Sequence, residues 1–422
     1  MLRFTDNAIV QLTLGCNCNC KYCYEGEAVK KHPKYIDYET FKKVVDSFIY
    51  QRCILGSLER TVNIHLHGGE LFTLPFEEIK KDIAYIEERK KFFPGVTYCL
   101  QTNGTLINDE IAEFFAEKGF TIGFSWDGYS VTDRGFSEQQ NYELIEKLRS
   151  FYLKYGTKFS CLSVFSKNNM KTWYKDMLSL RDFVSFFGVN PICTLPQFDN
   201  LIPSSEEQWE YWYKPVLESY LTGDAFRERA LDLAIQGLIT ENFCKVNPTE
   251  TRRTGCFDRI CGFETNMTAI DPDLNCYSCD KFLHEADYFF LRKPHKLLEP
   301  DFLGLQQAKR AFNHYKNMFA LEKEMGCYRC PCQHVCSGEC QSSNISKIGK
   351  PKLKDTPCDA YIKIYEFVRE HWLEMISYNE IQGEVPLVDF TPEAKYQAEK
   401  QGYNIYIDLE NNILKAKKKE LI

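Results

Sequence analysis

The sequence predicts an α/β protein whose first half is an open, partial (β/α)6 barrel of the TIM type. Short apolar runs alternate with helical patterns along residues 8 to 197. Six such units favour right-handed crossovers and a parallel sheet, and six are too few to close an eight-stranded barrel. Cysteine and glycine motifs also follow the apolar runs directly, as loops at the carboxyl edge of such a sheet do.

The predicted strands are short and rich in Val, Ile, Phe and Thr, which is typical of a buried parallel sheet. They are Ala8–Leu14, Thr61–His67, Val96–Gln101, Phe120–Trp126, Lys158–Ser166 and Gly188–Leu195. The predicted helices between them are Tyr38–Tyr50, Phe76–Lys91, Asp109–Lys118, Glu138–Tyr155 and Lys171–Phe187. Asn108 and Ser137 are suitable N-caps for the third and fourth of these helices.

Composition divides the rest of the chain. Residues 198–254 are predicted to form a helical bridge that begins near Ser204, residues 255–380 form a cysteine-dense domain, and residues 381–422 form a tail. Within the cysteine-dense domain, residues 270–280 are typical of a β-hairpin, and a long amphipathic helix is expected from Asp359 to about Tyr378. In the tail, Asn404–Leu409 and Ile413–Lys417 are predicted to pair as a second hairpin.

Charge and hydropathy exclude several classes of function. The formal net charge of −7 argues against nucleic acid as the main partner, because phosphate binding requires a basic field. No window holds the ~20 uncharged apolar residues of a membrane span, and the N-terminus is too polar for a secretory signal. We therefore expect a cytoplasmic protein with neither a nucleic-acid nor a membrane partner.

The chain has 19 cysteines, which is many for a cytosolic protein. A disulfide framework belongs to small secreted chains, so ligation of metal or iron–sulfur clusters is the better interpretation. Cys16, Cys20 and Cys23 follow the first strand with the spacing C-x3-C-x2-C. Three thiolates in one loop suit a [4Fe–4S] cluster that keeps one iron open.

Ten of the cysteines lie between Cys256 and Cys358. Four of these ten form a C-x2-C-x5-C-x3-C run, namely Cys327, Cys330, Cys336 and Cys340. Cys358 would lie at the start of the long helix, where the free N–H groups and the helix dipole favour a thiolate. For the remaining cysteines, burial as small apolar side chains is the better interpretation; they are Cys18, Cys53, Cys99, Cys161, Cys193, Cys244 and Cys332.

The N-terminal cysteine loop, with Tyr22 before its last cysteine, resembles the radical S-adenosylmethionine (SAM) superfamily. Gly68-Gly69-Glu70 looks like the motif that holds the amino group of SAM in that family, and the distal cysteines resemble its SPASM extension. The resemblance implies three [4Fe–4S] clusters, one that binds SAM and two auxiliary ones. It also implies a peptide or protein substrate and a reductase partner such as flavodoxin or ferredoxin.

The resemblance assigns roles by position. Cys16, Cys20 and Cys23 would hold the SAM cluster, Tyr22 would lie against the adenine, and Ser125 would also contact SAM. The first auxiliary cluster would take Cys261, Cys279 and Cys340, with Cys256 as its least secure ligand. The second would take Cys327, Cys330, Cys336 and Cys358. Cys276 competes with Cys279, and Leu274 stands where the family usually has glycine, which leaves the form of that turn open.

In the mechanism that the resemblance implies, SAM yields a 5′-deoxyadenosyl radical that abstracts hydrogen from the substrate. Asp280 matches the Cys-Asp of anaerobic sulfatase-maturating members, where the carboxylate is a general base; a structural role is equally compatible. Crosslinking, thioether formation, epimerisation and dehydrogenation of a peptide are the expected outcomes. Formylglycine formation from Cys or Ser, a small-molecule alcohol substrate, a structural zinc site and plain electron transfer stay as alternatives.

Overall fold

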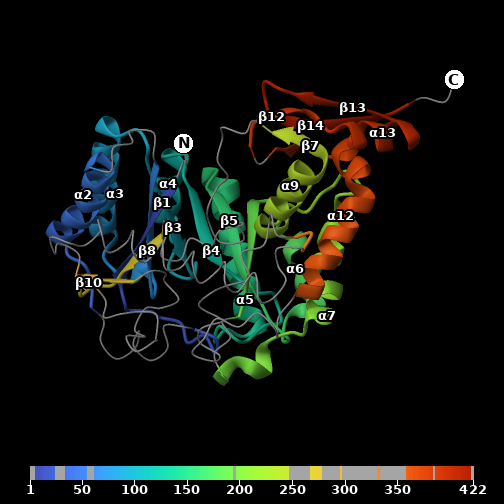
Figure 1. The fold of residues 1–422 in the computed structure, drawn as a ribbon. Helices are drawn as coiled ribbons and strands as arrows, with labels where there is room; N and C mark the ends of the chain where they lie inside the picture. Colours follow the sequence, from blue (N-terminus) through green and yellow to red (C-terminus); the bar gives the residue numbers. More distant parts are fainter. Residues whose placement is uncertain are drawn as a thin grey trace.

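Figure 1 shows the fold of this chain in a computed structural model. The structure describes residues 5–23, 34–54, 61–192, 196–246, 267–277, 295–296, 330–332, 358–383 and 385–419. Within these ranges the dominant feature is one nine-stranded sheet, in the order β10-β9-β8-β1-β2-β3-β4-β5-β6. Strands β1 to β6 run parallel to one another, as the alternating pattern predicts.

Helices connect the parallel strands in chain order. The strands are β1 (Thr5–Thr13), β2 (Thr61–Gly68), β3 (Val96–Thr102), β4 (Thr121–Ser125), β5 (Lys158–Phe165) and β6 (Val184–Pro191). The helices are α2 (Tyr38–Ile54), α3 (Phe76–Phe92), α4 (Asp109–Glu117), α5 (Glu138–Tyr155) and α6 (Met170–Leu178), and a short turn η1 (Leu71–Thr73) follows β2. The predicted open α/β sheet with these βα units is confirmed.

Two helix starts form as the sequence predicts. Asn108 accepts a hydrogen bond from the Ile111 backbone N–H at 2.9 Å. Ser137 and Gln140 form a reciprocal capping box at the start of α5. The predicted end of the fifth helix is wrong, because α6 stops at Leu178 and residues from Val184 already belong to β6. The apolar run that includes Leu180 and Phe183 extends the helical pattern, and periodicity alone does not separate it from a buried strand.

The two faces of the sheet differ in character. On β2, the buried side chains of Val62, Ile64 and Leu66 alternate with the half-buried ones of Asn63 and His65. The apolar set belongs to the main core together with the helices. The polar set therefore lies on the other face, which we call the inner face of the sheet.

A hairpin far along the chain extends the sheet beside β1. Its strands are β8 (Met267–Ile270) and β9 (Asn275–Tyr277), and β8 pairs with β1 in parallel while β9 pairs with β10 (His295–Lys296). The hairpin itself is predicted from the sequence, but its attachment to β1 is not. Leu274 in its turn has a φ of +62°, so this leucine adopts the left-handed conformation that glycine favours.

The bridge after β6 is helical, as predicted. It contains η2 (Pro196–Leu201), α7 (Ser205–Gln208), a π-helical turn η3 (Trp209–Tyr213), α8 (Lys214–Ser219), α9 (Arg229–Phe243) and the short strand β7 (Cys244–Val246). Ser204 and Glu207 form a capping box at the predicted start. Helix α9 begins at Arg229, where the Glu228 side chain caps it by accepting from the backbone N–H groups of Ala230 and Leu231.

The C-terminal part contains the long predicted helix α12 (Cys358–Tyr378), which Figure 1 shows beside α9. Phe243 of α9 stacks on Trp372 of α12 with the ring centroids 4.3 Å apart. After α12 come β11 (Ile381–Gln382), β12 (Leu387–Phe390), α13 (Pro392–Lys400), β13 (Tyr403–Asp408) and β14 (Ile413–Lys418). The predicted tail hairpin is confirmed as β13 and β14.

No helix in the described part of the chain is long and apolar enough to cross a membrane.

Candidate functional site

The loops that follow β1, β2 and β3 meet at the carboxyl edge of the sheet. The Gly69 N–H donates to the Thr13 carbonyl at 2.9 Å, and the Glu70 N–H donates to the Gly15 carbonyl at 2.8 Å. These bonds join the end of β2 to the start of the cysteine loop. The edge on which the sequence places its motifs is therefore one connected structure.

Glycine is required where β2 approaches the cysteine loop. A Cβ atom on Gly68 would lie 2.4 Å from the Thr13 carbonyl oxygen, and the φ of Gly68 is +152°. A Cβ atom on Gly69 would lie 2.5 Å from the Gly15 carbonyl oxygen. Backbone atoms cannot retreat as a flexible side chain can, so any side chain here would push the cysteine loop away.

Glu70 connects the ends of β2 and β3 from a fully buried position. One carboxylate oxygen accepts from the Thr102 hydroxyl at 2.7 Å, and the other accepts from the Asn103 N–H at 2.6 Å. Burial raises the pKa of Glu70, while these hydrogen bonds lower it. The side chain thus supports the edge of the sheet, and its predicted contact to the amino group of SAM stays a prediction.

The cysteine loop carries four half-buried thiols, on Cys16, Cys18, Cys20 and Cys23. A hydrogen bond from Cys18 lowers the pKa of Cys16 to about 7, whereas burial raises the pKa of Cys20. Thiolates are the form in which cysteine binds iron. The donors therefore fit a cluster, and the Cys16 thiol ionises more readily than an ordinary cysteine.

Within the described ranges, no three His, Cys, Asp or Glu side chains converge on a single metal ion. A [4Fe–4S] cluster does not require such convergence, because each cysteine binds a different iron at a different corner. The ligand role of Cys16, Cys20 and Cys23 therefore stays a prediction.

Asn17 and Asn103 fix the cysteine loop to the loop after β3. The Asn103 side-chain amide donates to the Asn17 Oδ1 atom at 2.7 Å, and the Asn17 Nδ2 atom donates to the Thr105 hydroxyl at 2.8 Å. Asn103 lies in the run Thr102-Asn103-Gly104 directly after β3, a composition typical of a turn. Nothing in the sequence indicates that Asn17, between two cysteines, is the partner.

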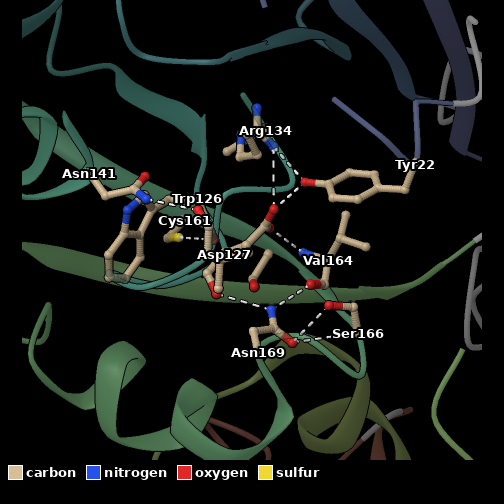
Figure 2. Close-up of polar contacts among 12 residues, drawn as sticks. Tyr22, Trp126, Asp127, Arg134, Asn141, Cys161, Val164, Ser166 and Asn169 are labelled. Atoms are coloured by element: carbon tan, nitrogen blue, oxygen red, sulfur yellow. Dashed lines mark hydrogen bonds and ion pairs between the residues drawn. The ribbon is translucent and has the colours of Figure 1, made fainter. Parts of the chain in front are cut away.

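Tyr22, Asp127 and Arg134 form a buried group behind the cysteine loop (Figure 2). The Tyr22 hydroxyl donates to Asp127 Oδ2 and accepts from Arg134 Nη1, which lies 3.2 Å away. Arg134 and Asp127 form an ion pair at 4.0 Å, and Asp127 Oδ1 accepts from the Val164 N–H at 2.8 Å. Burial raises the pKa of the Asp127 carboxyl, and the Arg134 charge opposes that shift.

This group gives Tyr22 a structural role, whereas the adenine contact that the resemblance implies for it stays a prediction. Its ring packs in a small apolar cluster with Ile192, Phe198 and Leu201. Its hydroxyl is bonded to Asp127, which follows β4 and in turn accepts from the Val164 N–H of β5 (Figure 2). Arg134 is not predictable from the sequence, because a single arginine in a loop carries no periodic or spacing signal.

Lys21 and Asp133, the chain neighbours of Tyr22 and Arg134, form a second contact between the same two loops. The Lys21 N–H donates to the Asp133 carbonyl at 2.7 Å, and the Lys21 ammonium pairs with the Asp133 carboxylate at 3.2 Å. Asn168 Nδ2 donates to the other Asp133 oxygen at 2.7 Å. Three loops are thereby connected around the cysteine segment.

Ser125, the other predicted SAM contact, lies at the end of β4 on the inner face. Its hydroxyl accepts from the Gln101 side-chain amide of β3 at 2.8 Å. Of the predicted SAM-site residues, the structure thus brings together Gly68, Gly69, Glu70 and the cysteine loop, with Ser125 on the adjoining strands.

Most predicted auxiliary-cluster residues lie outside the described residues. They are Cys256, Cys261, Cys279, Asp280, Cys327, Cys336 and Cys340. Cys330 is described and half-buried, and Cys358 is the first residue of α12. Cys276, the competitor of Cys279, is buried on β9 and its thiol faces the Leu274 carbonyl at 3.7 Å. The Cys332 thiol donates to the Tyr361 carbonyl at 3.3 Å, which brings the Cys330 segment to the first turn of α12.

Comparison with known proteins identifies one family model and several relatives that match this chain. Residues 10–175 match the family model of the Radical SAM superfamily. The chain is 31% identical over 206 residues to an uncharacterized protein of Methanocaldococcus jannaschii, a match that covers 47% of this chain and 64% of that protein. It is 22% identical over 374 residues to a cysteine-type anaerobic sulfatase-maturating enzyme of Clostridium perfringens, which covers 84% of this chain and 93% of that enzyme.

Two solved structures share the fold. Native anSMEcpe with bound AdoMet has a TM-score of 0.64 and 19% identity, and the match covers 86% of this chain and 97% of that one. Streptococcus suis SuiB bound to S-adenosylmethionine has a TM-score of 0.54 and 15% identity, with 85% of this chain and 78% of that one covered. At these identities the likeness is one of fold.

Proposed function

The chain carries a domain of the Radical SAM superfamily over residues 10–175, and on that premise we propose that it is a peptide- or protein-modifying radical SAM enzyme. The observation that carries the proposal is the connected edge of the sheet. There the three thiols of the C-x3-C-x2-C loop, Gly68–Glu70 and the Asn17–Asn103 contact meet in one structure.

In this proposal Cys16, Cys20 and Cys23 hold a [4Fe–4S] cluster whose open iron takes SAM. When bound, the cluster supplies the electron that cleaves SAM to methionine and a 5′-deoxyadenosyl radical, which abstracts hydrogen from the substrate. The chain's own residues position and enclose this chemistry. Gly68 and Gly69 let the end of β2 lie against the cysteine loop, where the methionyl group would bind, and Ser125 faces the same side from β4.

The buried Tyr22–Asp127–Arg134 group contributes rigidity and charge. It fixes the loop between Cys20 and Cys23, because the Tyr22 hydroxyl is held by both other residues. Burial raises the pKa of Cys20, and the Arg134 charge opposes that shift; the same charge adds to the Cys18 hydrogen bond that lowers the pKa of Cys16. An electropositive neighbour of this kind stabilises a cluster site that carries negative charge.

The distal cysteines are proposed to hold two auxiliary clusters. The first takes Cys261, Cys279 and Cys340, with Cys256 as its fourth ligand, and the second takes Cys327, Cys330, Cys336 and Cys358. The contact between Cys332 and Tyr361 supports the second set, because it brings the chain near Cys330 to the helix that begins at Cys358. Iron and sulfide counting tests both: about twelve irons per chain are expected from three clusters, and zinc with about four irons would refute them.

The substrate is proposed to be a peptide or a protein segment, modified by crosslinking, thioether formation, epimerisation or dehydrogenation. Relatives with the same fold support this class, since anSMEcpe and SuiB have been solved with bound peptides. Formylglycine formation is the second candidate. It is favoured by the similarity to anaerobic sulfatase-maturating enzymes along 84% of this chain, and Asp280 would be its general base.

The test is anaerobic incubation with SAM and dithionite, with 5′-deoxyadenosine and methionine measured by mass spectrometry. The wild-type protein should form both products, and the Cys16→Ala/Cys20→Ala/Cys23→Ala variant should form neither. Cys244→Ala is a suitable control, because this buried thiol lies in β7, outside the cysteine loop. Product formation by the triple variant would refute the proposal. Co-expression with peptides from neighbouring genes, followed by mass analysis, would then identify the bond formed.

A further inference from the structure

A thiol and an imidazole face each other across the inner face of the sheet. Cys99 of β3 and His65 of β2 are register partners, and the Cys99 sulfur lies 3.1 Å from the His65 Nδ1 atom. Both side chains are half-buried, whereas Leu66 and Leu100 beside them point into the core. Cys99 is expected from the sequence to be a small buried apolar side chain, and its polar contact departs from that expectation.

The other nitrogen of His65 is held by two amides. Asn7 Oδ1 of β1 lies 3.1 Å from the His65 Nε2 atom, and Asn63 Nδ2 lies 3.0 Å from the same atom. One contact offers an acceptor and the other a donor, so either tautomer of the ring finds a partner. The ring can therefore carry its proton on Nδ1, toward the sulfur, or on Nε2, away from it.

The pair lies below the SAM-binding edge rather than within it. Cys99 precedes Gln101 by two residues on β3, which places it about 7 Å further along the strand from that edge. Gln101 itself contacts Ser125, one of the proposed SAM contacts. His67, two residues after His65 on the same face, has a buried Nδ1 atom without a hydrogen-bond partner among the described residues. This region of the inner face thus offers polar groups to a ligand from beneath the SAM edge.

Two uses of a cysteine beside a histidine compete. A nucleophile needs the thiolate, as in cysteine proteases in which Cys, His and Asn act together. Burial instead raises the pKa of Cys99 to about 11, although the Arg229 charge opposes the shift. The sulfur therefore keeps its hydrogen at neutral pH, and a thiol is a good donor of a hydrogen atom.

We propose that Cys99 is a catalytic residue that returns a hydrogen atom to the carbon radical of the substrate, with His65 as its positioning and proton-donating partner. The proposal rests on the proposed radical SAM function and narrows its reaction class. Hydrogen is removed from one carbon and replaced at that carbon, so the substrate is neither oxidised nor crosslinked. Inversion of a stereocentre in a peptide is the reaction that fits.

Atoms and electrons balance in this step. The Cys99 S–H bond breaks homolytically, its hydrogen atom forms the new C–H bond, and a thiyl radical is left on sulfur. A one-electron reductant of the iron–sulfur or ferredoxin class reduces the thiyl radical to thiolate. A proton from water then restores the thiol by way of the His65 ring: Nδ1–H passes to the sulfur as Nε2 takes up a proton from water, so the ring stays neutral and only changes tautomer.

The test uses SAM alone as the probe, in D2O. The holoenzyme is incubated anaerobically with SAM and dithionite, without added thiols, and the isotopic mass of 5′-deoxyadenosine is measured. The thiol exchanges its hydrogen for deuterium, so a 5′-deoxyadenosyl radical without a peptide substrate should take deuterium from Cys99. We expect deuterated 5′-deoxyadenosine from wild type and its loss in Cys99→Ala. Cys161→Ala should keep it, because that buried thiol lies on the core side of β5 and contacts the Trp126 carbonyl.

The outcomes separate the two proposals. No 5′-deoxyadenosine from wild type would refute the proposed function itself. 5′-Deoxyadenosine with equal deuterium content in wild type and Cys99→Ala would overturn the role of Cys99 and leave the SAM chemistry intact. Iron content of each variant reports folding, so the deuterium comparison uses only variants that load iron like wild type.

Discussion

Asp127→Asn should destabilise the protein far more than its single charge suggests. Asp127 is 2% exposed and Arg134 is 7% exposed, so the change leaves a buried guanidinium without its counter-charge. Breaking a buried pair from one side costs about 3–5 kcal/mol. At about 2–4 °C per kcal/mol for a folding unit near 200 residues, the melting temperature should fall by roughly 6–20 °C.

Two matched variants calibrate this value. Tyr22→Phe removes the hydroxyl from the same group but no charge, and should cost about 1 kcal/mol. Asp182→Asn breaks the ion pair between Asp182 and Arg149. Because the Asp182 side chain is 54% exposed, this change should lower the free energy of unfolding by no more than about 1 kcal/mol.

The assay is thermal unfolding of the iron-loaded proteins under argon, followed by far-UV circular dichroism. Asp127→Asn/Arg134→Gln should melt above Asp127→Asn, because the double variant buries no unpaired charge. If Asp127→Asn shifts the melting temperature no more than Tyr22→Phe, or if the double variant is the least stable, the buried pair does not hold the loop as described.

Two further predictions concern the edge of the sheet and a buried acid. Gly69→Ala should lower the iron content and the formation of 5′-deoxyadenosine together, because its Cβ atom would meet the Gly15 carbonyl at 2.5 Å. Gly119→Ala is the control: its φ of +62° strains its own turn and costs about 1 kcal/mol, but no atom lies within 4 Å of its Cβ and it is remote from the cysteine loop, so it should load iron normally. Equal iron in both variants would contradict the steric explanation. Asp82 is 4% exposed, and burial raises its pKa to about 8. Its carboxyl is therefore protonated when folded and ionised when unfolded between about pH 4 and pH 8, so folding takes up a proton and stability falls as pH rises through that window. Asp82→Asn should gain stability over wild type progressively from about pH 5 to about pH 8, by the order of a few kcal/mol, and then level off; thermal melts at each pH would refute this if the difference stayed constant.

The sequence alone predicts those features of the fold that depend on neighbouring residues. Asn108, Ser137 and Ser204 all cap the helices that they are predicted to cap, because side-chain capping depends on residues within one turn. The order of the parallel strands also follows from alternation and from the right-handed crossover rule. The boundary between α6 and β6 is missed, since an apolar run around Phe183 suits either structure.

Contacts between segments that lie far apart in the chain could not be predicted from the sequence. Strand β8 pairs with β1 although about 260 residues separate Asn7 from Met267, and no local pattern marks that pairing. Arg134 reaches Tyr22 across 112 positions of chain. The Cys99–His65 contact needs the register between β2 and β3, which periodicity does not supply.

The cysteine loop has one feature that the sequence predicts and one that only the structure explains. Its spacing predicts the ligand set from residue types alone, and the structure adds which neighbours hold the loop. Gly68 and Gly69 are recognisable as a motif, but the reason for glycine becomes clear only from the approach of Thr13 and Gly15. Spacing therefore suggests the chemistry, and three-dimensional packing explains the residues around it.

The most direct test of the central claim is electron paramagnetic resonance of the dithionite-reduced protein before and after addition of SAM. If the cluster on Cys16, Cys20 and Cys23 keeps an open iron that binds SAM, the g-values of its signal should change on addition. The Cys16→Ala/Cys20→Ala/Cys23→Ala variant should lack that signal. A wild-type spectrum unchanged by saturating SAM, or a SAM-dependent change in the triple variant, would contradict the account.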